Sequence, residues 1–101
     1  MRNTKKETGG TSFHGVVFKA TPSDLRKILG VPVYEENDGS DKVNMEWNMQ
    51  TETGKVFTVY DWKEYRPLME NDMIEWHIGG FSKTDTEAAL CEIKGALMGL
   101  K

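Results

Sequence analysis

The chain has 101 residues, of which 38% are hydrophobic and 29% are charged, and its formal net charge is −3. This length and composition indicate one folded domain with a single modest core and argue against a disordered chain. No apolar run approaches the length of a membrane span, and the N-terminus lacks the apolar centre of a secretory signal. A single cysteine permits no internal disulfide. We therefore expect a cytoplasmic protein that has no contact with a membrane.

The charge is unevenly distributed along the chain. Residues 1–10 carry three basic residues and one acidic residue, a charge of +2, which leaves −5 for residues 11–101. The basic segment, which ends in two glycines, predicts a flexible tail over residues 1–10 ahead of a single α+β domain over residues 11–101. Because this domain is acidic, nucleic acid is not an expected partner.

The first predicted elements are a strand and a short helix. Residues 11–20 are rich in β-branched and aromatic side chains and end at a turn signal, which predicts a strand. The next residues, TPSDLRKILGVP, predict a helix with Thr21 as its N-cap, Pro22 in its first turn and Gly30 as its left-handed end. Its buried stripe would consist of Leu25, Ile28 and Leu29.

Residues 33–42 are acidic and rich in turn formers, and we expect them to be an exposed loop. Glu35, Asp38 and Asp41 do not keep the alternating register of a calcium-binding loop, and no glutamate closes it at the twelfth position. The segment therefore predicts a solvated connection without a metal ion.

Three strands are predicted after this loop. Apolar and polar side chains alternate from Val43 to Gln50, which predicts a strand with one buried and one solvated face, Asn44 lying on the solvated one. A turn leads to the strand 56–65 (VFTVYDWKEY), and a looser connection leads to the strand 74–81 (IEWHIGGF). Strands joined by short connections are expected to pair as an antiparallel meander.

The last predicted element is a helix. Thr84 and Glu87 have the spacing of a capping box, with Ser82 as a competing cap. A glycine such as Gly95 destabilises a helix interior by about 1 kcal/mol relative to alanine. We therefore expect either that the helix depends on packing for its stability or that its backbone approaches the sheet closely at Gly95. Cys91 is expected to be a half-buried small hydrophobe rather than a reactive thiol. The apolar face would consist of Ala89, Leu90, Ile93, Ala96, Leu97 and Leu100.

The order β-α-β-β-β-α predicts an α+β fold, a two-layer sandwich in which both helices cover one face of an antiparallel sheet. The other face would be open to water or to a partner. The pattern leaves open which side of the strand 56–65 faces outward. Phe57 and Val59 make the better core pair, which would turn Tyr60 and Trp62 outward, but the reverse arrangement or a bulge at residues 60–61 would change the outer set.

The open face is the candidate site. If Tyr60 and Trp62 point outward, they would join His77 in an aromatic patch with a charged rim, a composition favoured at binding interfaces. Strand aromatics also serve ordinary sheet packing, which is the competing interpretation. The candidate partner-binding residues are Glu46, Asn48, Tyr60, Trp62, Lys63, Glu75 and His77.

The sequence offers little for catalysis. It has two histidines and lacks the G-x-S-x-G and H-E-x-x-H patterns. A pair of His77 with Glu75 or Asp61 is compatible with acid–base chemistry, but such pairs arise often by chance. We predict that the protein is not an enzyme and has no catalytic residue, metal site or cofactor.

The element order after the first strand is similar to that of double-stranded RNA-binding domains. Those domains need lysines at the start of the last helix, where this chain has Asp85 and Glu87. RNA binding is therefore not predicted.

Four segments, GTSFHG, LRKILGVP, VFTVYDWKEY and EWHIGGFSKTDTEAA, resemble a group of small proteins without an established activity that tailed bacteriophages encode. The resemblance covers residues 10–89. Its most specific parts are Tyr60, Trp62 and Lys63, together with the E-W-x-I-G-G run at residues 75–80. It implies a phage accessory protein that acts in the cytoplasm of an infected bacterium.

Two functions are compatible with this combination. The first is a protein that binds and modulates a host protein, such as a bacterial defence factor, as an inhibitor or a trigger, through its open sheet face or a sheet edge. The second is a nucleotide-binding or nucleotide-sequestering protein, in which Tyr60 and Trp62 stack on the ligand and Lys63, Arg66 or Lys83 meets its phosphate. Self-association as a homo-oligomer through a sheet edge is compatible with both.

Overall fold

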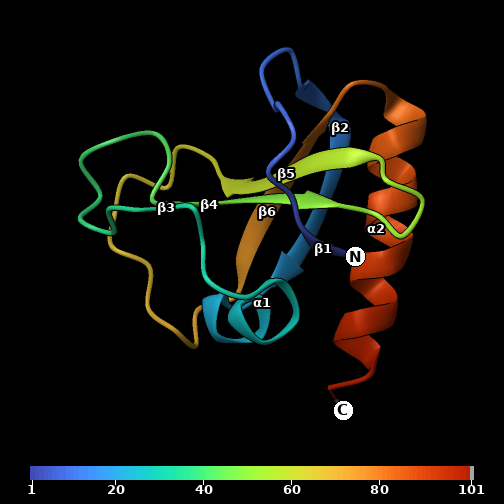
Figure 1. The fold of residues 1–101 in the computed structure, drawn as a ribbon. Coiled ribbons are helices and arrows are strands. Elements are labelled where there is room, and N and C mark those ends of the chain that lie inside the picture. The colour runs from blue at the N-terminus through green and yellow to red at the C-terminus, as the bar shows by residue number, and fades with distance from the viewer. Residues whose placement is uncertain (101) are drawn as a thin grey trace.

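The computed structural model describes residues 1–100 and has the predicted α+β architecture (Figure 1). Two helices, α1 (Pro22–Leu29) and α2 (Lys83–Met98), pack with one face of an antiparallel six-stranded sheet around a common core. The main strands are β2 (Ser12–Ala20), β4 (Met45–Gln50), β5 (Val56–Asp61) and β6 (Ile74–Gly80). Two short strands, β1 (Arg2–Asn3) and β3 (Tyr34–Glu35), complete the sheet. Neither helix has the length and apolar character needed to cross a membrane.

The strands lie in the order β1-β4-β5-β6-β2, with β3 also paired to β4. Strands β4, β5 and β6 form the predicted meander, and β2 runs antiparallel to β6 at one edge. The two short strands pair with opposite ends of β4, where Arg2 faces Gln50 and Tyr34 faces Glu46. They therefore cover an edge of the meander that would otherwise expose unpaired backbone groups.

Residues 1–10 make specific contacts with the rest of the chain. The ammonium group of Met1 lies 3.0 Å from the carboxylate of Glu92. The backbone N–H of Thr4 donates to the carbonyl oxygen of Asn48, and the ammonium of Lys6 donates to the carbonyl of Gly54. Most of these contacts involve backbone groups, which leave no periodic pattern in the sequence. The flexibility of the segment stays a prediction, but its path along β4 is defined.

The first helix has the predicted ends. The Thr21 hydroxyl accepts a hydrogen bond from the backbone N–H of Asp24, Pro22 is the first helical residue, and Gly30 adopts a left-handed φ of 86°. The predicted cap of the second helix, Thr84, is wrong. The hydroxyl of Ser82 accepts from the N–H of Asp85 because Ser82 has the extended backbone of an N-cap, so Thr84 lies inside the helix.

Two expectations about α2 are also corrected. A methyl group at Gly95 would have no heavy atom within 4 Å, so this glycine marks no close approach to the sheet. Cys91 is exposed rather than half-buried. It lies two residues from both Ala89 and Ile93, which form the buried stripe of the helix, and it therefore points to the opposite side.

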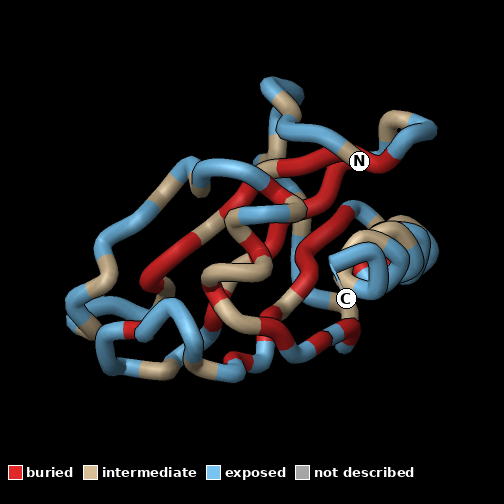
Figure 2. Tube along the Cα trace, turned by 90° about the horizontal axis from the view of Figure 1, so that it is seen from below, coloured by how far each residue is buried: buried red, intermediate tan, exposed pale blue. Residues whose placement is uncertain are grey.

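The core lies between the sheet and the helices, where the strands carry most of the buried residues (Figure 2). Trp47 and Trp76 have no exposed surface and meet edge to face, with ring centroids 5.6 Å apart. The indole N–H of Trp47 donates to the carbonyl of Gly30, and that of Trp76 donates to the carbonyl of Ala20, each at 2.9 Å. Both large side chains thus bury their polar atom in a hydrogen bond.

A buried polar network joins the two loops that precede β4 and follow β5. The Asp61 carboxylate accepts from the backbone N–H groups of Asn44 and Met45 and from the Asn44 side-chain amide, at 2.8 to 3.0 Å. The same amide donates to the carbonyl of Arg66, and its oxygen accepts from the N–H of Gly39. The prediction that Asn44 is solvated is wrong, because β4 begins only at Met45 and Asn44 turns inward to connect the loops.

Candidate functional site

The register of β5 decides which of its side chains face outward. Phe57 pairs with Met49 and Val59 pairs with Trp47, and all four side chains lie in the core. The expectation that Phe57 and Val59 are core residues is therefore confirmed. Tyr60 lies on the open face, opposite Glu46 on β4 and His77 on β6.

The pairing of β4 and β5 continues without a register shift from Gln50 to Glu46, so no bulge moves the following residues outward. Asp61 points to the closed side, where it is fully buried. It cannot orient His77, which lies on the opposite face of the sheet, so the acid–base pair of these two residues is not formed.

Four side chains form an aromatic patch on the open face: Phe13, Tyr60, Trp62 and His77. His77 lies at its centre, with the Phe13 ring stacked on it at a centroid distance of 4.2 Å and an angle of 20°. The rings of Tyr60 and Trp62 lie 5.6 and 6.3 Å from the His77 ring. Phe13 and Trp62 keep 44% and 39% of their surface exposed. The patch is therefore accessible although its members touch one another.

Two lysines flank the patch. The ammonium groups of Lys63 and Lys42 lie 5.6 and 5.9 Å from the centroid of the Trp62 ring, within the range of cation–π contacts. Lys63 has a left-handed φ of 56°, and its backbone N–H donates to the carbonyl of Lys42 at 2.7 Å. This turn directly after β5 brings both lysines to Trp62.

The remaining candidates lie at the margins of the patch. Glu75 is exposed on the same face of β6, two residues before His77 and paired with Lys19 of β2. Asn48 pairs with Thr58, and the segment 1–10 crosses beside it, since the N–H of Thr4 bonds to its carbonyl. The side-chain oxygen of Asn48 is buried without a hydrogen-bond partner among the described residues. All seven candidates thus lie on or beside the open face, and the segment 1–10 partly covers Asn48.

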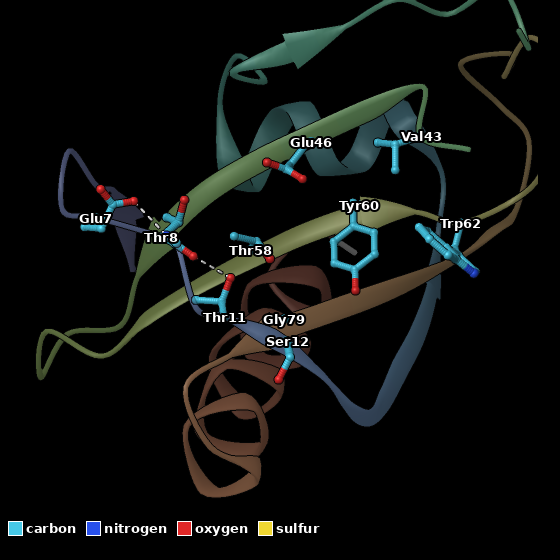
Figure 3. Close-up of a pocket in the computed structure, with 11 residues that line it drawn as sticks. Glu7, Thr8, Thr11, Ser12, Val43, Glu46, Thr58, Tyr60, Trp62 and Gly79 are labelled. Carbon is cyan, nitrogen blue, oxygen red and sulfur yellow. Dashed lines mark hydrogen bonds between the residues drawn. The ribbon is translucent and has the colours of Figure 1, made fainter. Parts of the chain in front are cut away.

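A cavity of about 480 Å³ lies on the open face between the N-terminal residues and Tyr60 (Figure 3). We call it the Tyr60 groove. The sheet contributes Glu46, Thr58 and Tyr60 to its walls, and Trp62 lies at one end. Residues 7–9, 11 and 12 form the opposite wall, where the Thr11 hydroxyl donates to the carbonyl of Thr8.

The groove is acidic. Burial raises the pKa of the Glu46 carboxyl, and neither a hydrogen bond nor a neighbouring charge in residues 1–100 counteracts it. Burial and the charge of Glu46 both raise the pKa of Tyr60. The pKa of His77 is lowered by burial, and the charge of Glu75 opposes this shift. Burial on this face therefore favours the neutral forms of Glu46, Tyr60 and His77 relative to the same groups in water.

Sequence reasoning missed Phe13, Lys42 and residues 7–12. Alternation along residues 13–20 was a usable signal for Phe13, because it sets Phe13 and Val17 opposite the buried Val16 and Phe18. Its stacking on His77 was not predictable, since it depends on a register shift between Phe13 and Val17. Residues 7–9 carried no signal, because their position depends on contacts with distant strands.

The described residues contain no group of three or more His, Cys, Asp or Glu side chains placed to hold a metal ion. Two of the cations considered for a phosphate lie away from the groove. Arg66 pairs with Asp72 at 2.9 Å, and Lys83 begins α2 on the closed side of the sheet. Of the three cations considered for a phosphate, only Lys63 lies at the patch.

Comparisons of the chain with protein-family models, curated proteins and solved structures found no match. The resemblance to small phage proteins therefore stays a prediction, and the assignment of function depends on the geometry of the open face.

Proposed function

We propose that this protein is a non-enzymatic binding module that docks onto a partner protein through the open face of its sheet. The observation that carries the proposal is the aromatic patch of Phe13, Tyr60, Trp62 and His77, two of whose members keep large exposed surfaces. Exposed aromatic side chains clustered on a regular element are typical of the centre of protein–protein interfaces. Because Phe13, Tyr60 and His77 project from paired strands, they need little ordering on binding.

The surroundings of the patch support the same function. Lys42, Lys63, Glu46 and Glu75 surround it with charges of both signs, as expected for the polar rim of an interface. Charges of both signs favour a partner with a complementary pattern rather than a polyanion. This mixed rim favours a protein partner over nucleic acid.

The proposed organism and cellular compartment of the partner follow from the resemblance to phage proteins alone. In that setting the partner is a host protein in the cytoplasm of an infected bacterium, such as a defence or regulatory factor. The protein would inhibit or trigger this factor by occupying its surface.

The Tyr60 groove is the one observation that favours a small ligand instead. Its volume of about 480 Å³ falls in the range of ligand pockets. A nucleotide is disfavoured because Glu7 and Glu46 line the groove, and two of the three cations considered for its phosphate lie elsewhere. Detection of a stoichiometric co-purifying nucleotide by mass spectrometry would establish this second function.

The proposed function is tested by affinity capture from a host lysate with wild-type protein and two variants, Trp62→Ala and Met98→Ala. Met98 is a matched control, because it is an exposed apolar residue on α2, away from the open face. We expect at least one stoichiometric protein to be retained by wild type and by Met98→Ala and lost with Trp62→Ala. Retention of every partner by a folded Trp62→Ala variant would overturn the proposal.

A further inference from the structure

We infer that the Tyr60 groove accepts an arginine side chain of the partner protein, with its guanidinium held between the Glu46 carboxylate and the Tyr60 ring. The inference rests on the proposed function, because it names the part of the partner that the open face would hold. Three observations carry it: the charge of the walls, the unpaired state of Glu46 and the aromatic surface beside it.

The walls of the groove carry two carboxylates, Glu7 and Glu46, and no basic side chain. One oxygen of Glu7 already accepts a hydrogen bond from the N–H of Gly9 at 2.7 Å. Lys42 and Lys63 lie over Trp62 at one end and do not line the cavity. The charge of the groove is therefore complementary to a cation and repels a phosphate or a carboxylate.

Glu46 differs from other carboxylates of the protein. Glu35 bonds Arg26 at 2.6 Å, Asp72 bonds Arg66 at 2.9 Å, and Glu92 lies 3.0 Å from the Met1 ammonium. Glu46 is partly buried, and within residues 1–100 no donor or cation pairs with it. A partly desolvated carboxylate without a partner is unfavourable in the free protein. A cation supplied by a bound partner would offset this cost.

The aromatic side chains give the groove its preference for a planar cation. Tyr60 lies directly opposite Glu46 across the β4–β5 pair, and its ring meets Trp62 edge to face at 6.2 Å and 79°. Since two lysines already lie over Trp62, the Tyr60 ring is the aromatic surface left for an incoming group. A guanidinium can stack on a ring and bind a carboxylate with two parallel N–H bonds, which an ammonium cannot do.

The size and remaining walls of the groove fit this assignment. A volume of about 480 Å³ exceeds that of one extended side chain and leaves space for water. Hydroxyl groups of Thr8, Ser12 and Thr58 lie around the cavity as further acceptors for guanidinium N–H groups (Figure 3). A metal ion is a poorer occupant, because no group of three potential ligands surrounds it in the described residues.

The test uses the full chain labelled with nitrogen-15 and N-acetyl-arginine methylamide as the probe. Citrulline capped in the same way is the control ligand, since it has nearly the same shape without the charge. We expect arginine to shift the amide resonances of Glu46, Tyr60 and residues 7–12 in a saturable way, and citrulline to leave them unchanged. Equal shifts with both ligands, or none with arginine, would overturn the inference.

Two variants sharpen the test. Glu46→Gln keeps the shape of the side chain and should weaken the arginine response by about tenfold or more. Glu87→Gln removes an exposed carboxylate from α2 and should leave the response unchanged. An undiminished response of the Glu46→Gln variant would overturn the role of the carboxylate.

Free arginine distinguishes a partner's side chain from a small molecule. The capped probe resembles a residue within a chain, whereas the carboxylate of free arginine would be repelled by Glu7. We expect the capped probe to bind at least as tightly. Tighter binding of free arginine would mean a small-molecule site and overturn the assignment to a partner protein.

Failure of this inference is distinguishable from failure of the proposed function. If the arginine probe does not bind while Trp62→Ala still loses its captured partner, the inference is wrong and the proposed function stands. If the probe binds but Trp62→Ala retains every partner, the open face is not the docking surface and both assignments to a protein partner are overturned.

Discussion

The two faces of the sheet use tryptophan in opposite ways. On the closed face Trp47 and Trp76 have no exposed surface, and their indole N–H groups donate to the backbone at 2.9 Å. On the open face Trp62 keeps 39% of its surface exposed, and its nitrogen points away from Tyr60 (Figure 3). Residue type alone therefore does not separate packing from binding. Tryptophans that pack the core differ from one available for binding in their burial and in whether the indole N–H has a hydrogen-bond partner.

The largest expected effect contrasts these two faces directly. Trp76→Ala should lower the free energy of unfolding by about 3 to 5 kcal/mol, because it removes a buried ring and leaves a cavity. Trp62→Ala should lower it by less than about 1 kcal/mol, because much of that side chain is already exposed to water. Urea unfolding followed by circular dichroism measures both. Equal destabilisation by the two substitutions would contradict the division between the faces.

Asp61 lies between Tyr60 and Trp62 in sequence but belongs to the closed side. Asp61→Ala would leave the buried N–H groups of Asn44 and Met45 unsatisfied, so we expect a loss of about 2 to 4 kcal/mol in unfolding free energy. The matched substitution Asp85→Ala, in the first turn of α2, should cost less than about 1 kcal/mol. A mild effect of Asp61→Ala in the same urea titration would show that the loop network contributes little.

Gly95 tests a region remote from both faces of the sheet. Because a methyl group at this position would meet no atom within 4 Å, Gly95→Ala should stabilise the protein by up to about 1 kcal/mol through helix propensity alone. Thermal unfolding is expected to show a higher midpoint and unchanged partner capture. A lower midpoint would mean that an unrecognised contact requires glycine.

The smallest expected effect concerns Glu46 and pH. Because its pKa is raised in the folded state, the folded protein holds the proton more strongly than the unfolded chain. Stability attributable to Glu46 is therefore highest at acidic pH and decreases as the pH rises above about 4.5, the ordinary value for glutamate.

The matched variant isolates this contribution. Glu46→Gln should raise the unfolding free energy near neutral pH by up to about 1 kcal/mol and have little effect near pH 4. His77 has the opposite effect on the pH dependence of stability. Because its pKa is lowered in the folded state, the stability attributable to His77 decreases as the pH falls below about 6.5. Unfolding curves of both proteins at the two pH values measure the difference. A variant that is less stable at neutral pH would show that Glu46 has a partner within the protein.

Much of the fold could be predicted because its signals are local. The alternation in β4 and the caps Thr21 and Gly30 each depend on a few neighbouring residues. For the strand 56–65 the pattern left both orientations open, and only the better core packing of Phe57 and Val59 favoured the observed one. The burial of Asn44 could not be predicted, because its main partner Asp61 lies 17 positions away.

Part of the candidate site could also be predicted from the sequence. Tyr60 and His77 share a face because they are directly paired residues of neighbouring strands, and Trp62 follows directly after the end of β5. The sequence pattern left open whether this face or the opposite one is exposed. The groove beside these side chains was not predictable. One of its walls is formed by residues 7–12, and no sequence pattern indicated that these residues lie beside β4 and β5. Phe13 joined the patch through a register shift at Gly15, which has a φ of 85°.

The central claim is that the open face, and not the helical face, binds a partner. The most direct measurement is the fraction of the stoichiometric partner captured by Trp62→Ala relative to wild type, with Met98→Ala as the helical-face control and unfolding curves to show that both variants are folded. We expect Trp62→Ala to lose most of the partner while Met98→Ala retains it. Full retention by Trp62→Ala with loss by Met98→Ala would contradict the central claim.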